Sequence, residues 1–132
     1  MFEVCIEHTF AAGHALRNYH GKCENVHGHN YKVHVVVRGE TLDETGMLAD
    51  FVELKKLLRA VSEPLDHVFL NDIEPFTTLN PSAENMAWYI CEKMQEGLSQ
   101  ENPVEVAEVR VWETDIQFAT YRPPMKLFPN QR

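Results

Sequence analysis

The sequence has little positive charge. Twelve Lys and Arg residues stand against twenty Asp and Glu residues, so the formal net charge of the 132-residue chain is −8. Proteins that bind nucleic acid along its backbone gather Lys and Arg to displace counterions from the phosphates. The acidic balance therefore argues against a nucleic-acid-binding protein, and any anionic ligand must be held by a local site.

Long apolar runs and paired cysteines are also absent from the sequence. It has no stretch of about 18 apolar residues, the length that a membrane-spanning helix needs. Residues 1–10 alternate charged and apolar types, unlike a secretory signal. The three cysteines, Cys5, Cys23 and Cys91, are scattered without a C-x-x-C pair, so a disulfide framework is not expected. We expect a cytoplasmic protein with no membrane partner.

The hydrophobic pattern predicts a single domain, residues 1–132, of the α+β class. Alternating apolar residues predict strands over 2–10, 31–38, 104–114 and 118–122. A helix capped by Asp50 should end at Pro64, and a second helix, with Pro81 in its first turn, should reach about Leu98. The order ββααββ predicts a four-stranded antiparallel sheet with two helices on one face.

Two further expectations concern the ends of this predicted fold. A four-stranded sheet leaves open edges, which it can hide by joining the sheets of other subunits, so we expect a homo-oligomer whose sheets close into a barrel. Residues 123–132 hold three prolines and show no periodicity. This tail should run extended over the surface or across a neighbouring subunit.

The segment between the first two predicted strands is rich in His, Gly and Asn and should form a loop of about twenty residues. Loops of this length in compact domains are often functional, so this segment is the strongest candidate for a functional site. In an extended chain residues i and i+2 point to the same side, so His27 and His29 can reach one ion, with Gly28 leaving room between them. His14, after the first strand, is the best third ligand because a hairpin brings both strands together. The alternative is two ordinary polar residues at a strand end.

Three further groups could take part in chemistry. Cys23, beside Lys22 and four residues before His27, could be a thiolate base near a cation, or simply a small buried residue. Asp66 next to His67 could form a proton relay, or a helix-terminal Asp and a surface His. Glu113 interrupts an apolar face and could accept two N–H bonds from a heterocycle, or merely face an Arg.

Six motifs in one order give the chain a resemblance to the 6-pyruvoyl-tetrahydropterin synthase superfamily. They are Phe10-x-x-x-His14, Cys23-x-x-x-His27-Gly28-His29-Asn30-Tyr31, Gly46-Met47-Leu48-x-Asp50-Phe51, Leu65-Asp66-His67 with Leu70-Asn71, Asn80-Pro81-Ser82-Ala83-Glu84, and Trp112-Glu113-Thr114. The match runs nearly from end to end. The three residues between Cys23 and His27 resemble the bacterial 6-carboxy-5,6,7,8-tetrahydropterin synthases of queuosine biosynthesis, because the mammalian-type enzymes carry a longer insertion there.

The resemblance implies a tunnelling fold, in which trimers close four-stranded sheets into a barrel and pair into hexamers with active sites at subunit interfaces. It implies Zn²⁺ as cofactor, held by His14, His27 and His29. It further implies Cys23 as the base, Asp66 and His67 as the catalytic relay, and Glu113 as the pterin anchor.

The reaction that the resemblance implies is the conversion of 7,8-dihydroneopterin triphosphate to 6-carboxy-5,6,7,8-tetrahydropterin, with release of acetaldehyde and triphosphate. One alternative is a 6-pyruvoyl-tetrahydropterin synthase, which eliminates triphosphate without breaking the carbon chain. Another is a non-catalytic, zinc-stabilised assembly protein. The cations nearest in sequence for the triphosphate are Arg17, Lys22 and Lys32, and the sequence does not choose among them.

Overall fold

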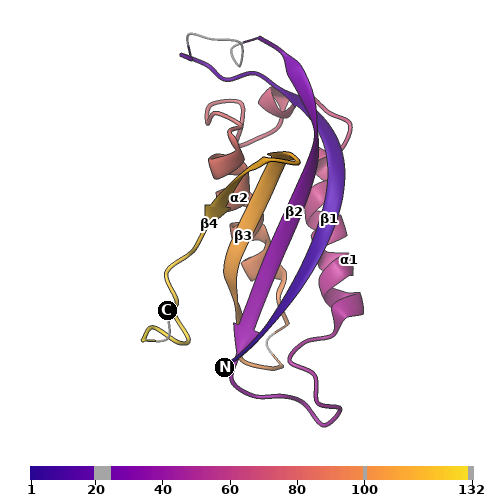
Figure 1. Cartoon of the computed structure of the whole chain (residues 1–132), viewed down its shortest axis with the longest axis vertical. Helices are drawn as coiled ribbons and strands as arrows, with labels where there is room; N and C mark the ends of the chain where they lie inside the picture. The colour runs from indigo at the N-terminus through magenta and orange to yellow at the C-terminus, as the bar shows by residue number, and fades with distance from the viewer. Residues whose placement is uncertain (20–24, 100, 131–132) are drawn as a thin grey trace.

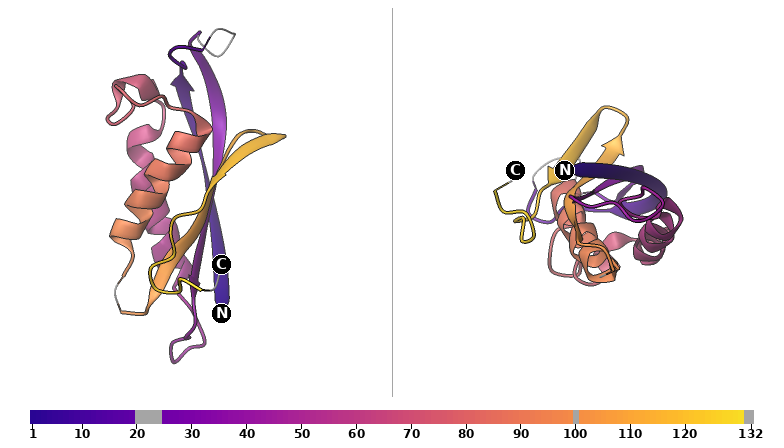
Figure 2. Two further views of the ribbon diagram at one scale, coloured as in Figure 1. Left: turned by 90° about the vertical axis from the view of Figure 1, so that its left-hand side faces the viewer. Right: turned by 90° about the horizontal axis from the view of Figure 1, so that it is seen from below.

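The computed structural model describes residues 1–19, 25–99 and 101–130. Its four strands form one antiparallel sheet in the order β1-β2-β3-β4, with both helices on one face (Figures 1 and 2). The elements are β1 (Phe2–His14), β2 (His27–Gly39), α1 (Phe51–Ser62), α2 (Ala83–Gly97), β3 (Val104–Thr114) and β4 (Gln117–Tyr121), with short 3₁₀ turns at Glu63–Leu65 and Leu70–Asp72. The predicted α+β class, the order ββααββ and the placement of the helices are confirmed.

The core forms where the apolar side of each strand faces the two helices. Val33, Val35 and Val37 alternate on β2 and are completely buried, as the period of two in a half-buried strand requires. Tyr31 continues this row toward the start of the strand and is also completely buried. The opposite face of the sheet carries charged and aromatic side chains, so the two faces differ sharply in polarity.

The first two strands are longer than the apolar alternation predicts. β1 extends to His14 and β2 begins at His27, and the pairing runs without a break from Phe2↔Gly39 to His14↔His27. The added residues include Gly13 and Gly28, which lie opposite each other and have no side chain to show an alternation. The candidate ligands therefore lie on paired strand ends, and the expectation of a loop of about twenty residues between the strands is wrong.

Both helices begin with side-chain caps. Asp50 accepts a hydrogen bond from the backbone N–H of Val52, at 2.8 Å, as predicted. Ser82 caps α2 by accepting from the N–H of Asn85 at 3.2 Å. Pro81 therefore precedes the cap instead of lying in the first turn, which leaves its carbonyl free to bind a side chain from β1. Among the described residues, no helix is long and apolar enough to cross a membrane.

The C-terminal tail is fixed to the chain's own sheet by a buried carboxylate. Glu105 on β3 is only 5% exposed and accepts hydrogen bonds from the backbone N–H groups of Lys126, Leu127 and Phe128. Met125, the residue before Lys126, is 7% exposed. The tail runs from β4 back toward the end of the molecule where the N-terminus lies (Figure 1).

We expect Glu105→Ala to detach this tail and to lower the free energy of unfolding by about 2–4 kcal/mol, since hydrogen bonds to a charged group are strong and three N–H groups lose their partner. Urea unfolding measures the loss, and limited proteolysis should cut after Lys126 faster than in the unchanged protein. Glu44→Ala, at an exposed loop position, is the control. Equal stability of the two variants would contradict the anchoring role.

Candidate metal centre

The β1–β2 register brings three histidines together. His14 pairs with His27, and Ala12 pairs with His29, so the three imidazoles lie on the same face at the ends of adjacent strands. One ring nitrogen from each histidine lies within 4.8 Å of the others. The predicted convergence of His14, His27 and His29 is what the structure shows, and such a cluster could hold a metal ion.

Backbone carbonyls orient two of these rings. Nδ1 of His14 lies 2.8 Å from the Pro81 carbonyl oxygen, and Nδ1 of His27 lies 2.8 Å from the Asn25 carbonyl oxygen. Because a carbonyl can only accept, each Nδ1 is the protonated nitrogen and each Nε2 carries a lone pair in the neutral ring. A carbonyl bonded to the far nitrogen is the usual way in which proteins orient a metal-binding histidine.

The two Nε2 atoms of His14 and His27 face each other at 2.9 Å. Two lone pairs at this distance repel unless a proton or a cation shares them. Nε2 of His29 is buried without a hydrogen-bond partner, which is costly for a polar atom. A metal ion bound by all three rings would relieve both conditions, so the residues present fit a transition-metal ion with nitrogen ligands.

Burial also favours the protonation state that a metal ion requires. His14 is 1% exposed, and the loss of hydration lowers its pKa below that of a free histidine. Burial lowers the pKa of His29 in the same way, although the nearby Glu113 carboxylate opposes the shift. Both rings are therefore neutral near pH 7, and neutral imidazole is the form that binds a metal ion.

Aromatic packing forms the wall behind the histidines. Tyr31 stacks on Phe10, its partner on β1, with ring centroids 5.2 Å apart. The Tyr31 ring also meets His29 edge to face at 5.4 Å and His14 at 5.9 Å. Burial and, secondarily, the charge of Glu113 raise the pKa of the Tyr31 hydroxyl, so it stays protonated. In the sequence Tyr31 is only the last residue of the motif that begins at Cys23, and this position alone predicts no role for it.

Glu113 lies beside the histidines, on the same side of β3 as the buried Val109 and Val111. Its Oε2 is 3.9 Å from Nε2 of His29 and accepts a hydrogen bond from the Gln117 amide at 3.1 Å. The β3–β4 register shifts between Trp112 and Thr114, so Glu113 lies at a bulge. The carboxylate is 18% exposed, and ligand N–H groups can therefore reach it.

Asp66 and His67 form a pair that is attached to the edge of β1. Asp66 Oδ1 is 2.8 Å from Nδ1 of His67 and also accepts from the Ala11 N–H at 3.0 Å. That backbone hydrogen bond is the main cause that lowers the pKa of Asp66. The backbone N–H of His67 donates a hydrogen bond to the Ala11 carbonyl. The backbone φ of His67 is 58°, a conformation that is uncommon outside glycine.

His67 and His29 line the same shallow hollow of about 400 Å³, formed by residues 11–13, 28–30 and 67–68. The His67 side chain is 81% exposed, so it projects into solvent from this hollow. A larger cavity of about 1050 Å³ lies between the 42–50 segment, α1 and the end of α2, and its lining includes no candidate site residue.

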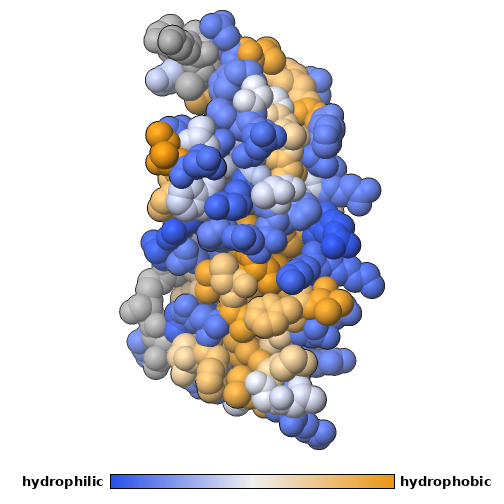
Figure 3. All heavy atoms as spheres, turned by 45° about the vertical axis from the view of Figure 1, so that its right-hand side comes forward, coloured by the Kyte–Doolittle hydropathy of each residue, from blue (hydrophilic) through white to orange (hydrophobic). Residues whose placement is uncertain are grey.

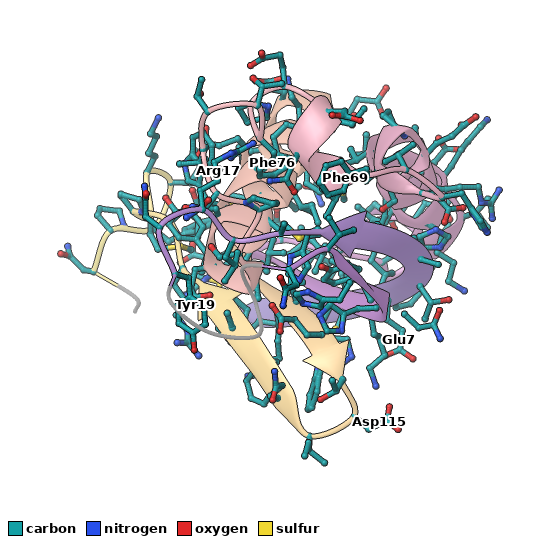
Figure 4. The ribbon with its side chains drawn as sticks, turned by 90° about the horizontal axis from the view of Figure 1, so that it is seen from above. Glu7, Arg17, Tyr19, Phe69, Phe76 and Asp115 are labelled. Carbon is teal, nitrogen blue, oxygen red and sulfur yellow. The ribbon has the colours of Figure 1, made fainter. Side chains whose placement is uncertain are left out.

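The remaining candidates have different positions. Cys23 and Lys22 lie outside the described residues. The Arg17 guanidinium donates to the carbonyl oxygens of Phe76 and Leu79, and Arg17 lies near Phe76 in the view from above (Figure 4). Lys32 lies over the Trp112 ring, 5.0 Å from its centroid. Because Lys32 alternates with the core-facing residues of β2, it points to the sheet face opposite the histidines.

A second set of contacts, not anticipated from the sequence, fixes the chain just after His14. The Asn71 side chain accepts a hydrogen bond from the backbone N–H of Ala15 and donates one to its carbonyl, and the Asn80 side chain makes the same two bonds with Arg17. Each asparagine thus replaces a missing strand partner. The only signal in the sequence is their place in the Leu70-Asn71 and Asn80-Pro81 motifs.

The chain is similar to known proteins over almost its whole length. The family model for 6-pyruvoyl tetrahydropterin synthase matches residues 3–124. The chain belongs to this family. A solved structure of the Caenorhabditis elegans 6-pyruvoyl tetrahydropterin synthase superposes with a TM-score of 0.80 at 34% identity, over 93% of this chain and 97% of that one.

The chain is similar to two kinds of synthase, which are named for different products. The 6-pyruvoyl tetrahydrobiopterin synthase of Homo sapiens is 42% identical over 107 residues, 77% of this chain and 71% of the relative. The 6-carboxy-5,6,7,8-tetrahydropterin synthase of Bacillus subtilis is 37% identical over 128 residues, 92% of this chain and 86% of the relative. The chain is thus a tetrahydropterin synthase family member, and these similarities alone do not choose between the two activities.

We expect the chain to bind one divalent transition-metal ion per subunit, and His27→Ala to weaken this binding by at least 100-fold because one of three ligands is lost. Competition with a chromophoric chelator measures the affinity. His34→Ala is the matched control, since His34 lies on the same strand but pairs with Glu7. Equal metal affinity of the two variants would contradict the assignment of the three ligands.

Proposed function

We propose that the protein is a zinc-dependent lyase that converts 7,8-dihydroneopterin triphosphate to 6-carboxy-5,6,7,8-tetrahydropterin. The observation that carries the proposal is the convergence of three imidazoles, with nitrogens within 4.8 Å of one another, beside the partly exposed Glu113 carboxylate. This arrangement combines a metal site with a group that can hold a nitrogen heterocycle. Membership of the tetrahydropterin synthase family supports the pterin substrate.

Zinc suits the donor set because it takes nitrogen ligands in tetrahedral geometry, and three protein ligands leave one position for substrate. A bound zinc ion would supply Lewis-acid stabilisation for negative charge that develops on the side-chain oxygens of the substrate. The carbonyls of Pro81 and Asn25 hold two of the rings for this task. Tyr31 and Phe10 keep water from the rear of the site.

Glu113 is proposed to anchor the pterin. Its two carboxylate oxygens can accept from a ring N–H and an adjacent amino group, a bidentate pattern that fits one edge of the pterin. The Gln117 amide already fixes one of these oxygens. Anchoring the heterocycle here would bring its side chain toward the histidines, because Glu113 lies 3.9 Å from His29.

Cys23 and the Asp66–His67 pair are proposed to move protons. Asp66 binds Nδ1 of His67 and thus leaves Nε2 free to exchange a proton with the substrate side chain. Cys23, as thiolate, would take the proton from the carbon next to the ring, and a nearby cation would favour its ionised form. Having two groups lets one site remove a proton and supply another near neutral pH.

The choice of the 6-carboxy reaction rests on the short gap between Cys23 and His27, which resembles the bacterial enzymes. The Bacillus subtilis relative also aligns over more of this chain than the Homo sapiens relative, 92% against 77%. The higher identity to the Homo sapiens relative, 42%, favours the 6-pyruvoyl reaction as the second candidate. By atom balance, carbon-chain cleavage consumes one water and gives acetaldehyde and triphosphate, whereas 6-pyruvoyl formation consumes none.

The proposal includes a homo-oligomer, a trimer or hexamer with interfacial sites. Residues 67–69 cover the end of β1, through a hydrogen bond between Gly13 and Val68 and a bridge to Phe69, but not its first half. Phe2, which lies in that half, is 48% exposed. Apolar residues gather on the lower part of this face (Figure 3). A stable monomer in sedimentation velocity would contradict the oligomer.

Incubation of the zinc-loaded protein with 7,8-dihydroneopterin triphosphate tests the proposed reaction. We expect acetaldehyde and a 6-carboxylated tetrahydropterin in equal amounts, identified by aldehyde trapping and mass spectrometry. A 6-pyruvoyl product without acetaldehyde would replace our proposal with the second candidate. No conversion at all would leave the third, a non-catalytic zinc-stabilised assembly protein.

The same assay separates the role of Cys23 from that of the metal site. Cys23→Ala should keep its zinc and lose turnover by roughly 100-fold or more, the usual contribution of a positioned proton-transfer group. Cys5→Ala, which removes an exposed thiol from β1, should keep both properties. Full turnover in Cys23→Ala would remove this residue from the mechanism.

A further inference from the structure

Tyr31 has a hydroxyl group that the resting fold leaves without a partner. The residue is completely buried, and its hydroxyl oxygen makes no hydrogen bond within the described residues. Packing does not need this oxygen, because a phenylalanine ring would stack on Phe10 equally well. A buried, unpaired hydroxyl costs free energy, and groups of this kind at a ligand site often have a partner only when the ligand is bound.

The surroundings of Tyr31 indicate that partner. Its ring contacts His14 and His29, so the side chain lies next to the candidate metal centre. The last pair of the antiparallel β2–β3 ladder is Lys32 with Trp112. Tyr31 precedes Lys32 and Glu113 follows Trp112, so the same register places Tyr31 beside Glu113. The Glu113 carboxylate also lies 3.9 Å from Nε2 of His29, whose ring meets that of Tyr31 edge to face at 5.4 Å.

We propose that the Tyr31 hydroxyl is a positioning donor that binds the Glu113 carboxylate when a pterin occupies the site. A carboxylate offers about four lone-pair positions. Two of them accept the N–H groups of the heterocycle, Gln117 takes a third, as it already does, and Tyr31 takes the fourth. The carboxylate would then be held on both sides. This inference rests on the proposed function of Glu113 as the pterin anchor.

The ring of Tyr31 and its hydroxyl have different roles. The ring supports the histidines in the resting state, whereas the hydroxyl acts only in the occupied state. Tyr31→Phe should therefore keep the fold and the metal ion. Because the variant removes an unpaired polar atom, its unfolding temperature should equal or exceed that of the unchanged protein.

Binding of neopterin, followed by its fluorescence, tests the proposal in the zinc-loaded protein. Tyr31→Phe should weaken neopterin binding by roughly tenfold, the loss expected for one hydrogen bond to a charged group. With 7,8-dihydroneopterin triphosphate, KM should rise by a similar factor while kcat changes less than about twofold. Tyr89→Phe, which removes the same atom from a tyrosine packed on Phe76, should change none of these values.

A double-mutant cycle with Glu113→Gln identifies the partner. If Tyr31 acts through Glu113, adding Tyr31→Phe to Glu113→Gln should weaken neopterin binding by less than about twofold further. Independent, additive losses would overturn the proposal, as would unchanged binding in Tyr31→Phe or a marked fall in its unfolding temperature. If the unchanged protein binds no neopterin, the proposed function itself fails.

Discussion

The antiparallel pairing of β1 with β2 is the constraint on which the candidate site depends. It runs from Phe2↔Gly39 to His14↔His27, and its register decides which side chains share a face. A slip of one residue would turn His27 and His29 to the opposite side of the sheet, away from His14. The apolar row of β2, completely buried from Tyr31 to Val37, prevents such a slip because it would expose the core.

Contacts from the segment between the helices complete what the strands begin. The Pro81 carbonyl orients His14. The side chains of Asn71 and Asn80 bind the backbone shortly after His14, at Ala15 and Arg17 respectively. Asp66 attaches the same segment to β1 through Ala11. Three side chains and one carbonyl of this segment therefore hold the end of β1 that carries His14, and outer contacts of this kind orient the ligands of metal sites.

Periodicity predicted the fold well because the apolar rows that produce it also build the core. The same criterion failed at the strand ends. Gly13 and Gly28 pair across the two strands without any apolar signal, and the strands extend beyond the residues whose alternation is visible. Pro81 was predicted in the first turn of α2, but Ser82 caps the helix by accepting from the N–H of Asn85, so the proline precedes the cap.

The candidate site was predictable where spacing or motif carried the information, as for the three histidines. The contacts of Arg17 and Lys32 were not predictable. A cation that is near a site in sequence can bind a carbonyl or an aromatic ring of its own chain rather than a ligand, as these two residues do. Tyr31 was not predicted as a site residue because a tyrosine in a row of apolar residues is typical of a core position. Its unpaired hydroxyl depends on the side chains that surround it in the fold, so the sequence holds no sign of it.

We expect three imidazoles to bind the metal ion and to leave one of its positions open. X-ray absorption at the zinc edge of the loaded protein measures this directly. The expected result is about three nitrogen ligands near 2.0 Å, a light atom in the fourth position and no sulfur. A sulfur ligand at about 2.3 Å in the presence of a pterin would show a closed site that includes Cys23, and would contradict the claim.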